Sequence, residues 1–306
     1  MRAVVFVEFG GPEVLQVRER AEPEVGPGQV RIAVRAAGVN PYDFKVRRGD
    51  VRSFVKTVFP AVPGFEVAGV VDQVGEGAAF SVGDEVVGWS QGGAYAEYAI
   101  AGTIAVKPAG LSWEQAASIP IAGETAQRVL DEVEVKPGET VLIHGAAGAV
   151  GSVAVQLAKA AGVTVVGTAS AANHDYLRSI GAIPVAYGAG LVERVREVAP
   201  RGIDAVIDTA GKGGLEESIE LRGGTTERIV TIADYEGAGK LGIKTSGGGR
   251  EPEAIRAGLA EQLKAAADGK LEVRIAATFG LAEAGKAQEL SESGHARGKV
   301  LILPQA

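Results

Sequence analysis

The segment from Thr140 to Gly162 constrains this chain most, because it joins an apolar stretch, a glycine-rich turn and an amphipathic stretch in that order. The apolar residues 140–144 predict a buried strand, and residues 150–161 place apolar side chains on one face of a predicted helix that ends at Gly162. Three glycines with the spacing G-x-x-G-x-x-G separate the two. This order of elements is typical of a βαβ unit that binds a dinucleotide.

Each glycine of this turn has a separate predicted role. Gly145 takes a tight turn, Gly148 lets the backbone approach a pyrophosphate, and Gly151 lets the helix pack close to the strand. The helix N-terminus adds unpaired N–H groups and a partial positive charge. The alternative is a turn that only packs an ordinary βα unit, but the flanking strand and helix favour dinucleotide binding. We assign the whole turn to the cofactor site: Gly145, Ala146, Ala147, Gly148, Ala149, Val150 and Gly151.

The next predicted strand, residues 163–168, indicates which dinucleotide is bound. It ends in small neutral residues, and the sequence has no acidic residue between Gly145 and Asp175. A carboxylate about 4 Å from a 2'-phosphate would cost on the order of 1 to 4 kcal/mol, so its absence favours NADPH. Candidate contacts at this end are Thr168, Ser170, Asn173, His174 and Tyr187, with Arg178 further along the helix. For His174 and Arg178, a solvated helix face is an equal alternative.

Apolar periodicity divides the chain into regions. Up to about residue 120, short valine-rich runs separated by turn residues predict a β-rich domain, and Ser112 with Gln115 forms a predicted capping box at a helix start. From about 138 to 232, strands and helices alternate, which predicts a parallel sheet covered on both faces. The remaining predictions are a mobile loop over 237–250, a helix over 252–267, a strand over 271–276, a helix over about 281–292, and a strand over 299–303 that rejoins the first domain.

Composition excludes several classes of protein. The 306 residues are 46% hydrophobic and 23% charged, as expected of a folded globular chain. A net charge of -7 and the absence of a basic tract argue against nucleic acid as a partner. The absence of cysteine excludes disulfides and thiolate zinc sites. The sequence shows no long apolar run or signal segment, so we expect no membrane association and a cytoplasmic location.

Further motifs are spread over nearly the whole chain: residues 64–71 with 74–77, 92–98, 208–211 and 295–300. Together they resemble the medium-chain dehydrogenase/reductase superfamily. Residues 38–45 and the glycine turn are similar to its zinc-free NADPH:quinone oxidoreductase branch, which is zeta-crystallin-like. The resemblance implies an α/β fold with a GroES-like β-rich catalytic domain (1–120 and 268–306) and a Rossmann domain with a doubly wound parallel sheet (121–267). It also implies a cleft where the two meet and a homodimer.

The same resemblance implies chemistry without a metal. Zinc-dependent relatives carry a cysteine and the histidine of a Gly-His-Glu motif where this chain has Asn40 and Phe65. The three histidines, 144, 174 and 295, have no ligand spacing, so we expect no metal site. Because no zinc stabilises an alkoxide, the acceptor must spread its own charge, as quinones and α,β-unsaturated carbonyls do by conjugation.

Three residues are candidates for catalysis, and each has an alternative role. Asn40 donates an amide N–H to the acceptor oxygen or the nicotinamide ribose, or else holds the turn before Pro41. Lys45 places positive charge near a developing oxyanion, or is solvated or paired. Thr125 matches the family position beside the nicotinamide, or satisfies a helix start. Its neighbours, Glu124 and Gln127, replace an apolar and an aromatic residue of the family.

The remaining assignments concern binding. Phe65, Trp89 and Phe279 would form an apolar slot for a planar acceptor, although each would also suit an ordinary core. We add Tyr42 to the substrate residues. Further cofactor contacts are assigned to Thr209, Ala233, Phe279 and Arg297.

The sequence therefore predicts a zinc-independent NADPH-dependent oxidoreductase that transfers hydride to a small quinone or α,β-unsaturated carbonyl. One alternative is an enoyl-thioester reductase, for which only Arg47, Arg48 and Arg52 suggest a basic entrance. Another is an NADPH-binding regulatory protein with little turnover.

Overall fold

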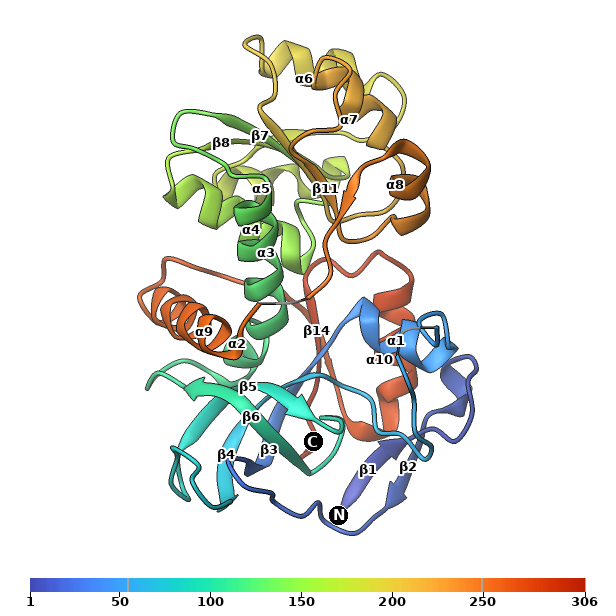
Figure 1. The fold of residues 1–306 in the computed structure, drawn as a ribbon, viewed down its shortest axis with the longest axis vertical. Helices are drawn as coiled ribbons and strands as arrows, with labels where there is room; N and C mark the ends of the chain where they lie inside the picture. The colour runs from blue at the N-terminus through green and yellow to red at the C-terminus, as the bar shows by residue number, and fades with distance from the viewer. Residues whose placement is uncertain (54, 249, 306) are drawn as a thin grey trace. The chain divides into compact units, whose positions relative to one another are not determined.

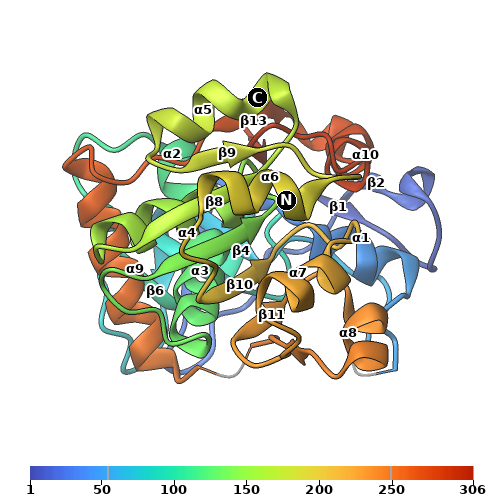
Figure 2. The ribbon, with the colours of Figure 1, turned by 90° about the horizontal axis from the view of Figure 1, so that it is seen from above.

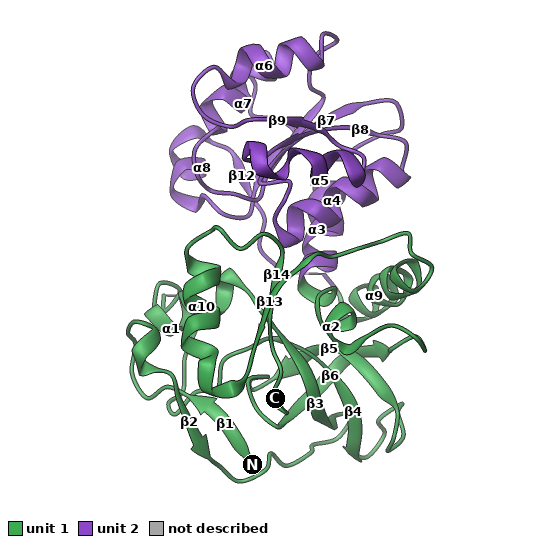
Figure 3. Ribbon diagram, turned by 180° about the vertical axis from the view of Figure 1, so that it is seen from behind, with its two compact units in different colours: residues 1–121, 251–306 green, residues 122–250 purple. Residues whose placement is uncertain are grey.

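The computed structural model describes residues 1–53, 55–248 and 250–305. The chain forms two compact units, Met1–Ile121 with Glu251–Ala306 and Ala122–Arg250 (Figure 3). The second boundary differs from the expected one at 267/268, because the helix over 252–267 packs against a strand of the first unit. No helix among the described residues is both long enough and apolar enough to span a membrane.

Unit 1 (Met1–Ile121 with Glu251–Ala306) is built on a six-stranded sheet with the order β13-β14-β3-β4-β5-β6 (Figure 1). β3 also pairs with β6, which closes part of the sheet as in a barrel. The strands are β1 (Arg2–Val5), β2 (Gln16–Glu19), β3 (Val30–Val39), β4 (Glu66–Val74), β5 (Glu85–Gln91), β6 (Tyr98–Val106), β13 (Ile275–Phe279) and β14 (Lys299–Ile302). The helices are η1 (Pro12–Val14), α1 (Pro41–Arg48), α2 (Trp113–Ala117), α9 (Pro252–Ala267), η3 (Leu281–Glu283) and α10 (Ala284–Glu292).

Alternating apolar side chains of these strands form the core of unit 1. Val30, Ile32 and Val34 of β3 are fully buried together with Val67 and Val71 of β4. The C-terminal strand β14 pairs with β3, so the end of the chain completes the sheet that its beginning starts, as the sequence predicts.

Unit 2 (Ala122–Arg250) contains a parallel sheet with the order β12-β11-β10-β7-β8-β9. Figure 2 labels β8, β9, β10 and β11 among these strands. Its strands are β7 (Thr140–His144), β8 (Thr164–Thr168), β9 (Ile183–Val185), β10 (Ala205–Asp208), β11 (Ile229–Thr231) and β12 (Lys244–Thr245). Its helices are α3 (Pro120–Glu132), which begins in unit 1, α4 (Ala149–Ala160), η2 (Ala171–Asn173), α5 (His174–Ser179), α6 (Leu191–Val198), α7 (Leu215–Leu221) and α8 (Tyr235–Leu241).

The strand order of unit 2 reverses between β7 and β10. From β7 the chain moves through β8 to β9 in one direction, and from β10 through β11 to β12 in the other. Because each crossover is right-handed, α4 and α5 cover one face of the sheet and α7 and α8 the other. This is the doubly wound arrangement that the sequence predicts, in which ligands bind at the carboxyl ends of the strands beside the switch point.

Local signals fix several helix starts. Ser112 and Gln115 form the predicted capping box, in which Ser112 Oγ accepts from the backbone N–H of Gln115 at 3.1 Å and Gln115 Oε1 accepts from that of Ser112 at 3.2 Å. The prediction of a mobile loop over 237–250 is wrong for the described residues, since α8 and β12 occupy part of it; Gly249 of that loop lies outside the described residues. Asp234 caps α8, its Oδ1 accepting from Gly237 N–H at 2.8 Å.

Candidate functional site

The glycine turn between β7 and α4 has the local geometry expected of a phosphate cradle. Gly145 has φ +70°, a left-handed conformation that favours glycine. A Cβ on Gly151 would overlap the carbonyl oxygen of Gly145 and lie 2.8 Å from Ala146 Cα, so only glycine allows this close packing of helix on turn. Gly148 is the N-cap of α4, and a Cβ there would meet only the oxygen of Gly145, at 3.3 Å. The backbone of Gly148 is therefore open to a ligand on that side.

Buried side chains hold this turn from inside the protein. Thr168 Oγ1 accepts from the N–H of Gly145 at 3.3 Å, and Thr209 Oγ1 donates to the carbonyl of His144 at 2.7 Å. Burial lowers the pKa of His144, so the imidazole is neutral, with Nε2 2.9 Å from Ser218 Oγ. Two predicted cofactor residues, Thr168 and Thr209, thus also support the turn itself.

The predicted 2'-phosphate residues follow β8 and β9. β8 pairs in parallel with β7, and β9 pairs in parallel with β8, so the carboxyl ends of all three strands lie at the same edge of the sheet as the glycine turn. Ser170 Oγ accepts from Asn173 Nδ2 at 3.1 Å, His174 Nε2 lies 3.3 Å from the carbonyl oxygen of Ala169, and Tyr187 is 62% exposed. The structure therefore places Ser170, Asn173 and Tyr187 after strands that end at the same edge of the sheet as the glycine turn.

The charged side chains of α5, which follows β8, form an ion pair with each other. Arg178, the cation further along the helix, forms an ion pair with the exposed Asp175 at 2.6 Å. The first carboxylate after β8 is therefore neutralised by its own helix, and no acidic side chain follows β8 before it.

In unit 1, three neighbouring strands bring Asn40, Glu66 and Lys299 together. Val300 of β14 lies opposite Val39 of β3, which places Lys299 beside Asn40. Ala37 of β3 lies opposite Val67 of β4, which places Glu66 beside Gly38. Asn40 and Lys299, 259 positions apart in sequence, therefore meet at one end of these three strands.

These three side chains form one buried polar cluster. Asn40 Oδ1 accepts from Lys299 Nζ at 2.7 Å, and Asn40 Nδ2 donates to Glu66 Oε1 at 2.8 Å. Lys299 Nζ also pairs directly with Glu66 Oε1, while Glu66 Oε2 accepts from the backbone N–H of Ile121 at 2.9 Å. Asn40 is 6% exposed. It also begins α1, as its extended backbone shows, so both predicted roles of this residue are compatible.

A second buried pair, Asp43 and Tyr95, adjoins this cluster. Asp43 Oδ2 accepts from Asn40 N–H and from the Tyr95 hydroxyl, each at 2.8 Å, while Oδ1 has no hydrogen-bond partner among the described residues. Burial raises the pKa of the Asp43 carboxyl to about 7, and the nearby Glu66 adds to the rise against the effect of the two hydrogen bonds and Lys299. Burial, and then Asp43, raise the pKa of Tyr95. The Asp43 carboxyl is therefore substantially protonated near neutral pH.

This raised pKa predicts a pH dependence of stability. An unfolded aspartate has a pKa of about 3.9, so between about pH 4 and 7 the folded state binds more protons at Asp43 than the unfolded state. Its contribution to the free energy of unfolding is therefore fully present below about pH 4 and falls as pH rises towards 7, by at most about 1.4 kcal/mol per pH unit. We expect Asp43→Asn, which keeps an acceptor for Tyr95, to remove this loss. Denaturant unfolding of the wild type and Asp43→Asn at several pH values between 5 and 8 gives the free energy of unfolding of each. The same dependence on pH in both proteins would contradict this expectation.

The aromatic substrate candidates lie beside the same cluster. Tyr42, in the first turn of α1, contacts Phe65 with ring centroids 4.9 Å apart and an edge-on geometry. Trp89 of β5 lies opposite Glu66 in the sheet. Phe65 and Trp89 are both half-buried, and so is Lys45 in the last turn of α1. The structure thus brings Tyr42, Phe65 and Trp89 close to the cluster that Asn40 and Glu66 form.

The other predicted residues have separate surroundings. Thr125 lies in α3 beside an ion pair in which Glu124 Oε1 accepts from Arg128 Nε at 3.0 Å. Glu124 and Gln127 are the polar residues that differ from the family in this helix. The ion pair with Arg128 balances the negative charge of Glu124. Ala233 packs against Gly211 in unit 2. Phe279 packs against the core of unit 1, and Arg297 is exposed in that unit.

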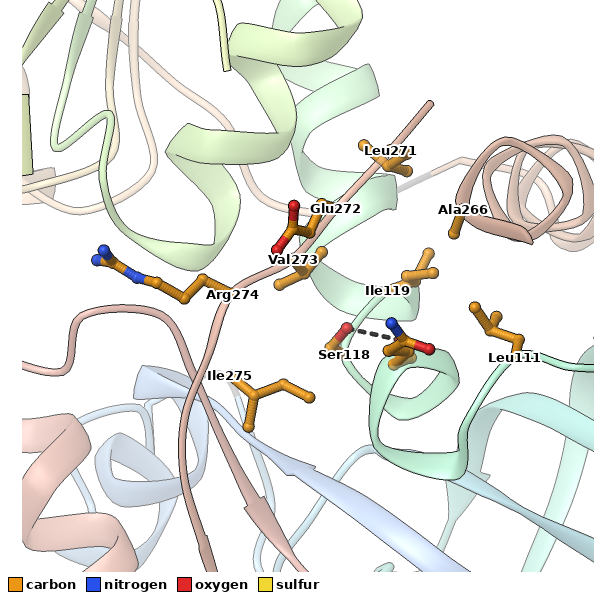
Figure 4. A pocket seen from close by; sticks show the side chains of 10 residues that line it. Leu111, Ser118, Ile119, Ala266, Leu271, Glu272, Val273, Arg274 and Ile275 are labelled. Carbon is orange, nitrogen blue, oxygen red and sulfur yellow. Dashed lines mark hydrogen bonds between the residues drawn. The ribbon is translucent and has the colours of Figure 1, made fainter. Parts of the chain in front are cut away.

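A pocket of about 300 Å³ lies in unit 1 between α2, the end of α9 and the segment before β13. Glu272 and Arg274 supply its charged groups, and Ser118 Oγ, also in its lining, donates to the carbonyl oxygen of Gln115 at 2.6 Å (Figure 4). None of the residues predicted for cofactor or acceptor lines it. Its position therefore does not bear on the predicted chemistry.

The side chains near the candidate site are not suited to ligate a metal ion. Among the described residues, no three His, Asp or Glu side chains are grouped so that they could hold a metal ion. At the two positions where zinc-dependent relatives supply ligands, Asn40 is engaged with charged neighbours and Phe65 has no donor atom. These residues do not fit a zinc ion.

Sequence reasoning missed Glu66 and Lys299 as members of the site. Both stood within motifs, but a charged residue in a motif does not by itself indicate burial. One signal was present in the sequence: Gly38 near the end of a strand rich in valine and alanine. A Cβ on Gly38 would overlap Glu66 Oε1, so this glycine makes room for the buried carboxylate.

Comparison with known proteins agrees with this architecture. Residues 26–110 match the alcohol dehydrogenase GroES-like domain family, and residues 181–302 match the zinc-binding dehydrogenase family. Human quinone oxidoreductase is 38% identical over 231 residues, which cover 72% of this chain and 70% of the human protein. The human synaptic vesicle membrane protein VAT-1 homolog is 37% identical over 220 residues, which cover 69% of this chain and 56% of that protein.

Solved structures show the same fold over nearly the full length. The quinone oxidoreductase from Coxiella burnetii has a TM-score of 0.83 and 34% identity, and the alignment covers 99% of each chain. The Escherichia coli quinone oxidoreductase, solved in complex with NADPH, has a TM-score of 0.86 and 27% identity over 99% of this chain and 100% of that one.

Proposed function

This chain belongs to the medium-chain dehydrogenase/reductase superfamily, in its quinone oxidoreductase branch, and we propose that it is a zinc-independent, NADPH-dependent reductase of quinones or α,β-unsaturated carbonyls. One observation carries the cofactor part of the proposal. The turn at Gly145–Gly151 leaves the backbone of Gly148 open in front of a 12-residue helix, where the N–H groups and helix dipole favour a pyrophosphate.

The preference for NADPH is supported by the end of β8. Ser170 is neutral and half-buried, and the next carboxylate, that of Asp175, is paired with Arg178. A 2'-phosphate at this end would therefore meet hydroxyl, amide and imidazole groups, in Ser170, Asn173, His174 and Tyr187, without like-charge repulsion. The E. coli quinone oxidoreductase solved with NADPH supports the same choice.

Bound NADPH supplies the hydride, and the residues of the chain orient and stabilise what receives it. We assign Asn40 as the donor to the acceptor oxygen, with Tyr42, Phe65 and Trp89 as the apolar surface for a planar acceptor. Thr125 is proposed to contact the nicotinamide, and Lys45 to add positive charge near the oxygen. No step requires zinc, because the residues present cannot ligate it.

Removal of the Asn40 amide tests the acceptor part of the proposal. Asn40→Ala should lower kcat about tenfold to a hundredfold, which corresponds to about 1.4 to 2.7 kcal/mol of transition-state stabilisation. The dissociation constant of NADPH should be unchanged, because the cofactor turn lies in unit 2. Steady-state NADPH oxidation with a quinone measures the first quantity and fluorescence titration the second. An unchanged kcat in a folded variant would remove Asn40 from the site.

Two other functions make different predictions about turnover. An enoyl-thioester reductase would oxidise NADPH fastest with an enoyl thioester. A regulatory NADPH-binding protein would bind the cofactor tightly and show negligible turnover with every acceptor. NADPH oxidation across a quinone, an enone and an enoyl thioester separates the three.

We also propose that the protein works as a cytoplasmic homodimer. β9 and β12 are the two end strands of the parallel sheet, and pairing of such an edge between copies would extend it. Sedimentation of the purified protein gives its mass in solution.

A further inference from the structure

Glu66 and Lys299 carry opposite charges and are buried inside the protein, where the loss of hydration costs free energy. Their side chains are 0% and 2% exposed. Removing two charges from water often costs as much as their attraction returns, so stability alone is a weak reason for such a pair. A specific neighbour that needs both charges is a stronger reason, and Asn40 touches each of them.

The two charges fix the orientation of the Asn40 carboxamide. The amide oxygen accepts from the Lys299 ammonium at 2.7 Å, and one amide N–H donates to the Glu66 carboxylate at 2.8 Å. Rotation of the amide by 180° would place its NH2 group against the ammonium and its oxygen against the carboxylate. Both contacts would then be repulsive, so the pair admits one orientation only.

The pair itself is held rigidly. Glu66 Oε2 accepts from Ile121 N–H at 2.9 Å, and the Glu66 side chain fills the space that the missing Cβ of Gly38 leaves. Lys299 begins β14, Asn40 directly follows the adjacent strand β3, and Glu66 begins β4 on the other side of β3. The amide of Asn40 is therefore set by the register of three strands.

One hydrogen of Asn40 Nδ2 remains, with no hydrogen-bond partner among the described residues. Because the amide oxygen of the same group faces an ammonium, the amide is polarised and this N–H is a better donor than that of a free asparagine. Such a donor is most valuable to an oxygen that gains negative charge during the reaction.

We propose that Glu66 and Lys299 are positioning residues, which hold and polarise the Asn40 amide so that its remaining N–H meets the acceptor oxygen as negative charge develops there. The inference rests on the proposed function, in which Asn40 contacts the acceptor. It implies that the pair acts on kcat more than on KM, since the interaction grows towards the transition state.

A double-mutant cycle tests this dependence on Asn40. Glu66→Gln with Lys299→Met removes both charges together, so that no unpaired charge stays buried. In the wild-type background this change should lower kcat for quinone reduction about tenfold, within the range by which contacting groups are coupled, and leave KM within about twofold. In the Asn40→Ala background the same change should alter kcat by less than about twofold.

A merely structural pair would behave differently, lowering kcat by the same factor in both backgrounds, and that result would overturn the inference. An unchanged kcat for Asn40→Ala alone would also overturn it, because the pair would have nothing to act through. If the charge-free variant does not fold, Glu66→Gln alone goes through the same cycle with the same criterion. Titration of NADPH and thermal unfolding accompany every variant. A wild type that oxidises no NADPH would reject the proposed function, whereas turnover with an additive cycle rejects only this inference.

Discussion

Gly148→Val should abolish NADPH binding, and all NADPH oxidation with it, in a protein that still folds. Gly148 has φ -76°, which any residue adopts, and a Cβ there would meet only the oxygen of Gly145, at 3.3 Å. The branched side chain would instead occupy the open side of the turn, where the pyrophosphate must approach the backbone. Fluorescence titration of the variant measures its binding of NADPH, and thermal unfolding shows whether it still folds.

Two other glycines serve as matched controls. A Cβ on Gly239 in α8 would meet no atom within 4 Å, so Gly239→Val should bind NADPH as the wild type does. Gly151→Val should instead destabilise the fold, because its Cβ would overlap Gly145 O. Full NADPH binding by Gly148→Val would contradict the position of the cofactor proposed here.

Ser170→Asp should convert the dinucleotide preference. A carboxylate at this half-buried position, about 4 Å from a 2'-phosphate, costs on the order of 1 to 4 kcal/mol, or about fivefold to nearly 1,000-fold in NADPH affinity. NADH, which has no 2'-phosphate, should lose far less. Titration of the wild type and the variant with both dinucleotides gives the four dissociation constants.

Ser170→Asn is the control for this charge. Asparagine has nearly the shape of aspartate and can still accept from Asn173, so its effect on NADPH should stay within a few-fold. Equal affinity of the wild type for both dinucleotides, or equal losses of both in Ser170→Asp, would contradict the assignment of NADPH.

Local signals were sufficient to predict much of the parallel-sheet unit. The strand over 140–144 has the predicted bounds, because it is a strongly apolar run between Glu139 and Gly145. The roles of Gly145 and Gly151 also followed from spacing alone, since backbone conformation and close packing are local properties.

Pairing between distant segments was harder to predict. A strand was expected over 271–276, but β13 runs over Ile275–Phe279, because its register is set by β14 and not by its own pattern. The helix over 252–267 was predicted correctly, yet its place in unit 1 depends on packing against β6. The residue types of these two segments do not indicate that β13 pairs with β14 or that α9 packs against β6.

The candidate site shows the same division. Asn40 and Tyr42 lie in the motif over 38–45 and Phe65 in the motif over 64–71, and the rings of Tyr42 and Phe65 do meet. The contact of Lys299 with Asn40 joins residues 259 positions apart and depends on antiparallel pairing of β14 with β3. The raised pKa of the Asp43 carboxyl likewise depends on complete burial of this side chain. An acidic residue in the first turn of a helix does not by itself indicate burial.

Single-turnover oxidation of bound NADPH, followed by stopped-flow absorbance, tests the proposed reaction most directly. The wild-type protein is mixed with a quinone in one arm and with a saturated ketone of similar size in the other. Because the chain supplies hydrogen bonds and orientation but no metal ligands, a quinone should oxidise NADPH at least about 100-fold faster, a difference of about 2.7 kcal/mol in activation free energy. Equal rates with quinone and ketone, or no oxidation with any conjugated acceptor, would contradict the proposed reaction.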